Sequence, residues 1–311
     1  MKRVLFIDDP KSKYPSLPGM KLCAYHLSIG DDFGLDIDHP DLVYISRIFS
    51  KSEGVMDDLR VYEADEVIIG GTGYDIKSEL PEEIEFMKPH YDLYPDMDYS
   101  LGYTSRGCIR NCGFCCVRQK EGVFKRWQHP KHFHDDRFDK IRLYDNNILA
   151  DKEWFFEVTK WILDNNLKVD FNQGLDVRLL DRGIVRMLKE LDLWGNLNFA
   201  WDFMETEKKV IKGIKLLKEY DFNLRSNIGF YVLTNFNTSH KEDLYRCKKL
   251  KSLGTNAYVM RYNMRGDYFT NKLARWCNAR WIYWSCDFVD YKRNTDEIRD
   301  EIKSFKMLEV E

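Results

Sequence analysis

The stretch TSRGCIRNCGFC, residues 104–115, connects a short apolar strand to the helical pattern that follows and determines how the larger part of the chain is interpreted. Its cysteines, Cys108, Cys112 and Cys115, have the spacing C-x3-C-x2-C. Soft thiolates favour iron–sulfur clusters, zinc and copper, and a four-iron cluster usually takes four cysteine ligands. Three thiolates leave one iron with open coordination positions, just as a catalytic zinc keeps one position for substrate. The spacing therefore indicates a metal site that binds a further molecule.

Two other interpretations of these cysteines remain open: a zinc loop, and an electron-transfer cluster whose fourth ligand is distant in sequence. Cys116, next to Cys115, could be that ligand, although consecutive cysteines point in different directions. Cys116 is otherwise expected to be a packed thiol.

Strands and helices alternate regularly from residue 101 onward. The predicted strands are 101–105, 140–145, 168–172, 197–201, 228–233 and 257–262. The predicted helices are 112–120, 151–165, 182–191, 206–219 and 241–253, the last followed by Gly254 as a C-cap. Six such units predict a parallel sheet curved into a partial (β/α)6 barrel over residues 96–293, with its active site at the carboxyl ends of the strands.

Residues 1–95 show a shorter alternation of the same kind. Strands are predicted at 4–7, 42–45 and 66–69, with helices at 21–28 and 54–64. This pattern predicts a small doubly wound, Rossmann-like α/β domain. Pro89 to Ser100 has no hydrophobic period and is the predicted linker, and a charged C-terminal helix is expected within 294–311.

Composition limits the class of protein. The 311 residues are 44% hydrophobic and 32% charged, which suits a globular chain of one or two domains. A net charge of −3 gives no global attraction to nucleic acid or to anionic membranes. No run approaches the ~20 apolar residues that span a bilayer, and the apolar stretch after Met1 is too short for a signal sequence. We therefore expect a cytoplasmic protein with no membrane partner, whose eight cysteines serve metal or redox chemistry.

The cysteine stretch resembles the radical S-adenosylmethionine (radical SAM) superfamily, whose motif is C-x3-C-x2-C with an aromatic residue before the last cysteine. Cys108, Cys112, Phe114 and Cys115 match it. The resemblance implies a 4Fe-4S cluster on the three cysteines, with S-adenosyl-L-methionine on the open iron. It also implies reductive cleavage to a 5'-deoxyadenosyl radical, which abstracts hydrogen from a substrate, and a reduced electron donor of flavodoxin or ferredoxin type.

The ends of later strands are expected to hold the rest of S-adenosylmethionine. Where family members often carry Gly-Gly-Glu, this chain has Asp145-Asn146-Asn147, in which Asp145 and Asn147 could accept hydrogen bonds from the methionine ammonium. The alternative is an Asn-rich turn that caps the next helix.

Polar residues also follow the third strand. Gln173 or Asn172 could bond the ribose, and Arg178 could pair with the methionine carboxylate. The alternative for Arg178 is a surface ion pair with Asp176. Further along the chain, Asp202 is a weaker candidate of the same type. Tyr258 or Met260 could flank adenine, although apolar strand residues are more often core.

Two stretches interleave bases with aromatic residues, a pattern that suits a nucleotide or RNA substrate. The first contains Arg106, Arg110, Arg118, Lys120, Lys125, Arg126 and Lys131, with Glu121 as its one acidic residue. The second contains Arg261, Tyr262, Arg265, Tyr268, Phe269, Lys272, Arg275, Trp276, Arg280 and Trp281. Solvated faces and a C-terminal core edge are the alternative interpretation.

Other candidate ligands carry weaker signals. His129, His132 and His134 form H-x2-H-x-H on a predicted loop and could hold zinc. An auxiliary cluster is not favoured, because the remaining cysteines lack paired C-x2-C spacing; they are Cys23, predicted to be core, and Cys247, Cys277 and Cys286.

The N-terminal domain is similar to a shortened form of the cobalamin-binding domains in one branch of this superfamily. The glycine turn Gly70–Gly73 after the third strand carries that likeness. Cobalamin itself is not favoured, because Asp36–Pro40 has the wrong spacing for the D-x-H-x2-G signature. A cobalamin-assisted methyltransferase and a non-catalytic iron–sulfur or zinc protein remain the alternatives to a radical enzyme acting on an unidentified substrate. A methylthiotransferase is disfavoured because Cys23 is the one cysteine before Cys108.

Overall fold

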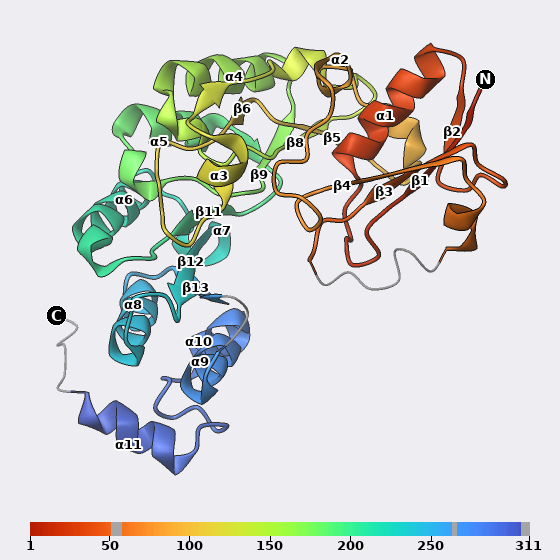
Figure 1. The fold of residues 1–311 in the computed structure, drawn as a ribbon. Helices are drawn as coiled ribbons and strands as arrows, with labels where there is room; N and C mark the ends of the chain where they lie inside the picture. The colour runs from red at the N-terminus through yellow and green to blue at the C-terminus, as the bar shows by residue number, and fades with distance from the viewer. Residues whose placement is uncertain (51–57, 263–265, 306–311) are drawn as a thin grey trace. The chain divides into compact units, whose positions relative to one another are not determined.

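The computed structural model describes residues 1–50, 58–262 and 266–305. The chain is mixed α/β with parallel sheets, as the alternating pattern predicts. It divides into two compact units (Figure 1). Unit 1 comprises residues 1–107 and 116–144, and unit 2 comprises residues 108–115 and 145–311. The domain boundary expected at residue 95 stays a prediction.

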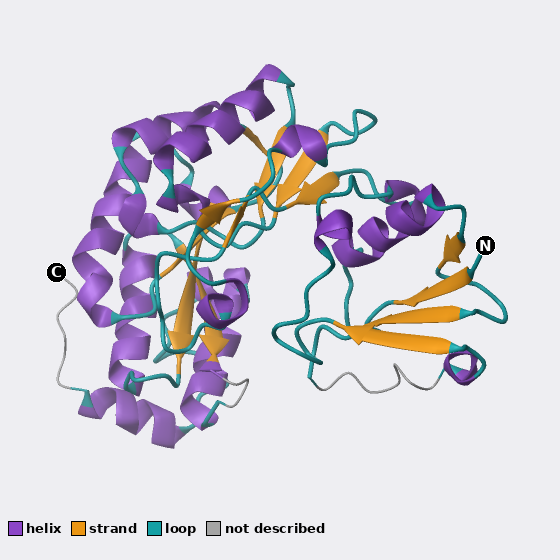
Figure 2. Cartoon of the chain, turned by 45° about the horizontal axis from the view of Figure 1, so that its top comes forward, coloured by secondary structure: helices purple, strands orange, loops and turns teal. Residues whose placement is uncertain are grey.

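Unit 1 contains a four-stranded sheet in the order β2-β1-β3-β4, in which every pair is parallel. Its strands are β1 (Arg3–Ile7), β2 (Asp32–Gly34), β3 (Leu42–Ser46) and β4 (Glu66–Gly70). Helix α1 (Leu17–Ser28) lies on one face, as Figure 2 shows, and the 3-10 turn η1 (Leu59–Tyr62) contributes Val61 to the opposite face.

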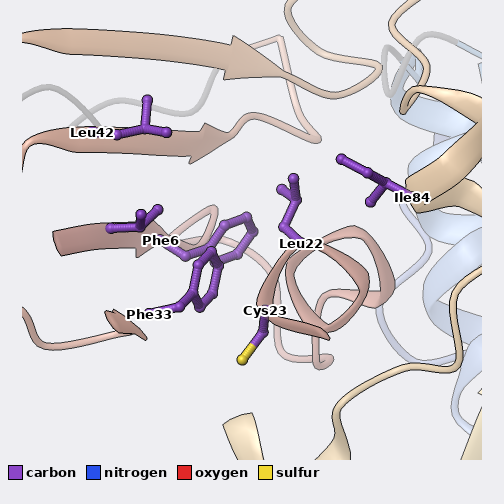
Figure 3. Close-up of a cluster of buried hydrophobic side chains, with 7 residues drawn as sticks. Phe6, Leu22, Cys23, Phe33, Leu42 and Ile84 are labelled. Carbon is purple, nitrogen blue, oxygen red and sulfur yellow. The ribbon is translucent and has the colours of Figure 1, made fainter. Parts of the chain in front are cut away.

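Alternation along β1 explains why both faces are covered. Val4 and Phe6 face α1, whereas Leu5 packs with the opposite cluster, because successive strand residues point to opposite faces. Figure 3 shows Leu22 and Cys23 of α1 beside the rings of Phe6 and Phe33, whose centroids are 6.2 Å apart. Cys23 is therefore a core residue, as predicted.

The remaining elements of unit 1 precede and follow the cysteine stretch in the sequence. Strand β5 (Ser100–Gly102) pairs in parallel with β8 (Lys140–Leu143), and β6 (Ser105–Arg106) forms an antiparallel pair with β7 (Lys125–Arg126). The short helical elements are α2 (Glu82–Glu85), η2 (Tyr91–Leu93), α3 (Val117–Glu121) and η3 (Pro130–His132).

Unit 2 contains the parallel pair β9 (Lys168–Phe171) and β10 (Asp192–Leu193), and a parallel sheet in the order β11-β12-β13. The sheet's strands are β11 (Leu197–Ala200), β12 (Ile228–Thr234) and β13 (Asn256–Arg261). Helix α8 packs against β12 and α9 against β13 (Figure 1). The helices are α4 (Lys152–Asp164), α5 (Arg182–Glu190), α6 (Glu207–Glu219), α7 (Leu224–Asn227), α8 (His240–Ser252), α9 (Tyr268–Asn278), α10 (Arg280–Ser285) and α11 (Asp296–Ser304). The 3-10 turns are η4 (Ile148–Ala150), η5 (Val177–Leu179) and η6 (Met204–Thr206).

All six strands predicted after residue 100 are present, as are the helices that match α4, α5, α6 and α8. Gly254 follows α8 with a φ of +85°, as a residue just past a helix end often does. The predicted helix 112–120 is wrong at its start, since α3 begins at Val117. Of the predicted helix 54–64, residues 54–57 lie outside the described residues, and the remainder contains only η1.

Candidate functional site

The cysteine loop, residues 108–115, belongs to unit 2 and is shaped by turns rather than by a helix. The backbone N–H of Cys115 donates to the carbonyl of Cys112 at 3.0 Å. The backbone N–H of Arg110 lies 3.3 Å from the sulfur of Cys108. These turn contacts hold the loop in place of helical hydrogen bonds, which is why the helix starts later than predicted.

The thiols influence one another electrostatically. Burial raises the pKa of Cys112, the positive charge of Arg178 lowers it, and the charges of Cys115, Asp202 and Cys108 raise it further. Cys108 and Cys112 are half-buried and Cys115 is exposed, and no disulfide joins any of the eight cysteines, all of which are described. The loop therefore brings the predicted ligands within range of each other's charge, together with Arg178 and Asp202.

The donor set suits an iron–sulfur cluster, although the thiols are not assembled around one point. Throughout the described parts of the chain, no three His, Cys, Asp or Glu side chains are placed to hold a metal ion. The amide nitrogen of Asn147 lies 3.6 Å from the sulfur of Cys108, and N–H donors to cysteine sulfur tune such clusters. The amide oxygen of Asn147 is buried and finds no hydrogen-bond partner among the described residues. An orphaned acceptor is costly, so this oxygen fits a donor brought by a bound molecule.

A three-residue ion network ties the loop to η5. Asp176 is 7% exposed and accepts from the Nε of Arg178 at 2.6 Å and from its Nη2 at 2.9 Å. The Nε of Arg110, a loop residue, donates to the same carboxylate at 3.0 Å. Burial would raise the pKa of Asp176, but Arg178 and Arg110 outweigh it and hold that pKa below its usual value. The ion pair weighed for Asp176 and Arg178 exists, but it is largely buried and includes a third partner.

The end of β11 is fixed by a residue that the sequence interpretation did not select. Arg246 on α8 is fully buried and donates to the carbonyls of Trp201 at 2.6 Å and Leu233 at 2.8 Å. Its charge is matched by Asp243 at 2.5 Å. The backbone N–H of Leu233 donates to the Asp202 carboxylate at 3.3 Å, and burial raises the pKa of Asp202. Arg246 thus locks the strand ends that carry Asp202. The i,i+3 spacing of Asp243 and Arg246 was its one signal in the sequence.

Aromatic side chains border the loop. The ring of Phe114 lies 5.7 Å from that of Phe203 and 5.5 Å from that of Phe236. The ring of Phe236 in turn lies 4.8 Å from the ring of Tyr262. Gly113 leaves room for this contact, since a Cβ there would lie 3.3 Å from the ring of Phe236. Phe203, Phe236 and Tyr262 all follow strands of one sheet, which places this apolar wall at the carboxyl ends of β11, β12 and β13.

The other residues predicted to hold the cofactor differ in their exposure to solvent. Asp145 is buried, whereas Gln173 is exposed and Asn172 is half-buried. Tyr258 and Met260 are 49% and 48% exposed, so the expectation that they are core residues is wrong. Both lie on the same face of β13 because strand residues alternate, and the neighbours Ala257 and Val259 are buried on the other.

The histidine segment does not form a metal group. His134 is buried and bonds Ser100 through Nδ1 at 3.0 Å. The Nδ1 of His129 accepts from the backbone N–H of Lys131, which marks a turn. Among the described residues these three imidazoles do not form a group placed to hold a metal ion, and the zinc hypothesis for His129, His132 and His134 stays a prediction.

The glycine turn after β4 approaches the chain's own backbone. Gly71 has a φ of +104°, and a Cβ there would lie 2.5 Å from the carbonyl oxygen of Arg47. A Cβ on Gly73 would lie 2.4 Å from the carbonyl carbon of Phe49. The close approach that suggested a ligand is therefore made to residues 47–49, which accounts for these glycines without cobalamin.

The basic stretches are distributed over several elements. In unit 1, Arg106 pairs with Glu121 at 3.4 Å, and Lys120 bonds Thr72 at 2.5 Å. In unit 2, residues 268–278 form α9 and residues 280–285 form α10, while Arg265 lies outside the described residues. The second stretch is therefore mostly helical, and Phe269 and Trp276 are core residues.

The chain was also compared with known proteins and searched for membrane spans. Among the described residues, no helix is both long enough and apolar enough to cross a bilayer. No protein-family model and no curated protein matches the chain. The candidate site is therefore interpreted from its own residues: three cysteines on one loop, an ion network that anchors the loop, and polar and aromatic groups at the carboxyl ends of parallel strands.

Proposed function

We propose that this chain is a radical S-adenosylmethionine enzyme. Cys108, Cys112 and Cys115 are its ligands for a 4Fe-4S cluster, and the parallel strands of residues 96–293 are its partial β/α barrel. When bound, the reduced cluster supplies the electron that cleaves S-adenosylmethionine to methionine and a 5'-deoxyadenosyl radical. We also propose that its N-terminal domain is Rossmann-like, that it is located in the cytoplasm, and that its electron donor is of flavodoxin or ferredoxin type.

One observation carries the proposal: the C-x3-C-x2-C loop shares unit 2 with polar residues from successive strand ends. In parallel β/α sheets, ligand sites form at the carboxyl ends of the strands. The charge of Arg178 lowers the pKa of Cys112 and that of Asp202 raises it. The amide nitrogen of Asn147 lies 3.6 Å from the sulfur of Cys108. A structural zinc site would require a fourth protein ligand beside the three thiols.

Each residue has a role that its contacts support. Asn147 orients the Cys108 sulfur through its amide N–H, and its unpartnered oxygen is an acceptor for the ammonium of a bound amino acid. Asp202, held by the Leu233 N–H, is a second acceptor. Phe114, Phe203 and Phe236 exclude water from the loop.

Arg178 has a different role from the one expected. Its Nε and Nη2 are engaged by Asp176, so it positions the loop and supplies positive charge beside Cys112 rather than offering an open fork to a carboxylate.

The test is anaerobic reconstitution with iron and sulfide, followed by dithionite and S-adenosylmethionine, with products identified by mass spectrometry. The expected product is 5'-deoxyadenosine. Cys112→Ala should abolish both cluster binding and the product. Cys116→Ala is the matched control, since Cys116 is the exposed neighbouring thiol outside the motif, and it should leave both unchanged.

The alternatives give different results. A reconstituted cluster that yields no 5'-deoxyadenosine refutes the proposal in favour of a non-catalytic iron–sulfur protein, and stoichiometric zinc without iron favours a zinc loop. S-adenosylhomocysteine together with a retained corrinoid would indicate a cobalamin-assisted methyltransferase.

A further inference from the structure

A second basic and aromatic site lies at the opposite ends of the strands from the cysteine loop. A pocket of about 550 Å³ opens to solvent between α7 and α10, and it includes Ser226, just before β12, and Asn256, the first residue of β13. The aromatic wall of the candidate cofactor site follows the other ends of these strands, at Phe236 and Tyr262. The pocket is therefore separate from that site. Its lining residues are Arg225, Ser226, Asn256, Arg280, Trp281, Trp284 and Ser285.

The pocket is held in shape by hydrogen bonds. The indole N–H of Trp284 donates to the amide oxygen of Asn256 at 2.9 Å. The amide nitrogen of Asn256 donates to the carbonyls of Arg225 at 2.8 Å and Ile228 at 3.0 Å. The guanidinium of Arg225 stacks 4.4 Å from the ring of Trp284. One tryptophan and one arginine are thus fixed before anything binds.

The side chains of Trp281 and Arg280 are exposed to solvent. Trp281 is 76% exposed, so its ring is accessible from solvent at the pocket wall. Arg280 donates to the carbonyl of Ser226 at 3.2 Å. No carboxylate lines the pocket, and neither Arg225 nor Arg280 forms an ion pair within the described residues. The site combines an exposed ring with positive charge that nothing in the described chain neutralises.

We infer that this pocket binds single-stranded nucleic acid, with a base stacked on Trp281 and backbone phosphates paired with Arg225 and Arg280. Aromatic rings stack on any base, and guanidinium groups pair with phosphate through their planar fork. The arginines come from two different elements, α7 and α10, which suits successive phosphates of a strand rather than a single anion. This inference does not depend on the proposed radical chemistry.

The test is fluorescence anisotropy of a labelled oligouridylate against the full chain at several salt concentrations. Trp281→Ala should weaken binding by roughly five-fold to a hundred-fold, because one base loses its stacking partner, and Trp281→Phe should recover part of the affinity. Arg280→Gln should weaken binding and reduce the slope of log affinity against log salt by about 0.7. Both positions are at the surface, so circular dichroism should show unchanged folding for all three variants.

Tyr268→Ala is the matched control. Tyr268 is an exposed aromatic residue beside Lys272 in the same basic and aromatic stretch, but it lies outside the pocket. It should leave binding unchanged. The inference is overturned if the unaltered protein does not bind the oligonucleotide, or if Trp281→Ala and Tyr268→Ala behave alike. Equal competition by uridine monophosphate, or binding to anionic vesicles in place of the oligonucleotide, also overturns it.

Discussion

Replacing Asp176 by asparagine should loosen the cysteine loop from unit 2. Asparagine keeps one acceptor oxygen but removes the negative charge shared by Arg178 and Arg110. Breaking a fully buried ion pair costs about 3–5 kcal/mol, whereas exposed pairs contribute about 0–1 kcal/mol. Asp176 is 7% exposed, but its partners Arg178 and Arg110 are 24% and 33% exposed, so water offsets part of the loss. We expect the free energy of unfolding to fall by about 2–3 kcal/mol.

The assay is urea denaturation combined with a double-mutant cycle. Asp176→Asn and Arg110→Gln should show a coupling energy of about 1 kcal/mol, because they share a direct contact. Since Arg110 lies between Cys108 and Cys112, losing its anchor should also speed the modification of the loop thiols by a thiol reagent in the native protein.

Asp164→Asn is the control for charge removal. Asp164 pairs with Lys160 at 2.7 Å on the surface of α4, and its loss should change the free energy of unfolding by less than about 0.5 kcal/mol. If Asp176→Asn proves as mild as this control, and the thiols react at their original rate, the reasoning about the ion network is refuted.

Three further predictions concern the framework of unit 2. Arg246→Met should destabilise the chain by about 3–5 kcal/mol in urea denaturation, because it leaves the buried Asp243 without its partner; a loss below 1 kcal/mol would contradict the role given to Arg246. Gly174→Ala should cost about 2 kcal/mol by the same assay, since Gly174 has a φ of +86° and a Cβ there would lie 2.8 Å from the carbonyl oxygen of Asn198; unchanged stability would show that the turn relaxes. His240 is bound by Glu301 at 2.6 Å and by Asp267, and although burial lowers its pKa, these carboxylates raise it above the ordinary 6.5. The protonated His240 stabilises the folded chain fully below pH 6.5, and this stabilisation is lost as the pH rises through the raised pKa. Thermal melts at increasing pH should therefore show a fall in melting temperature that the His240→Gln variant lacks.

Local patterns accounted for most of the parallel α/β fold. Strands β8, β9, β11, β12 and β13 were predictable because short apolar runs alternate with helical segments of adequate length. Helices α9 and α10 were missed, because the bases and aromatic residues of that segment suggested a binding surface first. Asp267 was the overlooked signal: its side chain caps α9 by accepting from the Thr270 N–H at 2.8 Å.

The candidate site was less predictable, because its geometry depends on contacts between distant segments. The cysteine spacing identified the thiols, and strand ends pointed to Asn147, Arg178 and Asp202. Nothing in the local sequence revealed that Arg110 would reach Asp176, 66 positions away, or that Phe236 would pack on Phe114. Such partners are selected by three-dimensional packing, for which neither periodicity nor motif spacing carries a signal.

The course of the chain through its two units determines how the candidate site can be taken apart. Eight residues, 108–115, belong to unit 2, while the segments on either side of them, up to 107 and from 116 to 144, belong to unit 1. A fragment that begins at residue 145 therefore retains Asp176 and Asp202 but lacks every proposed ligand, and a fragment that ends at residue 144 retains the cysteines without their anchors. A fragment keeps both only if residues 108–202 stay on one chain, and that stretch includes residues 116–144 of unit 1. Insertion, deletion or domain exchange in this chain must keep residues 108–115 and the segment after 145 together.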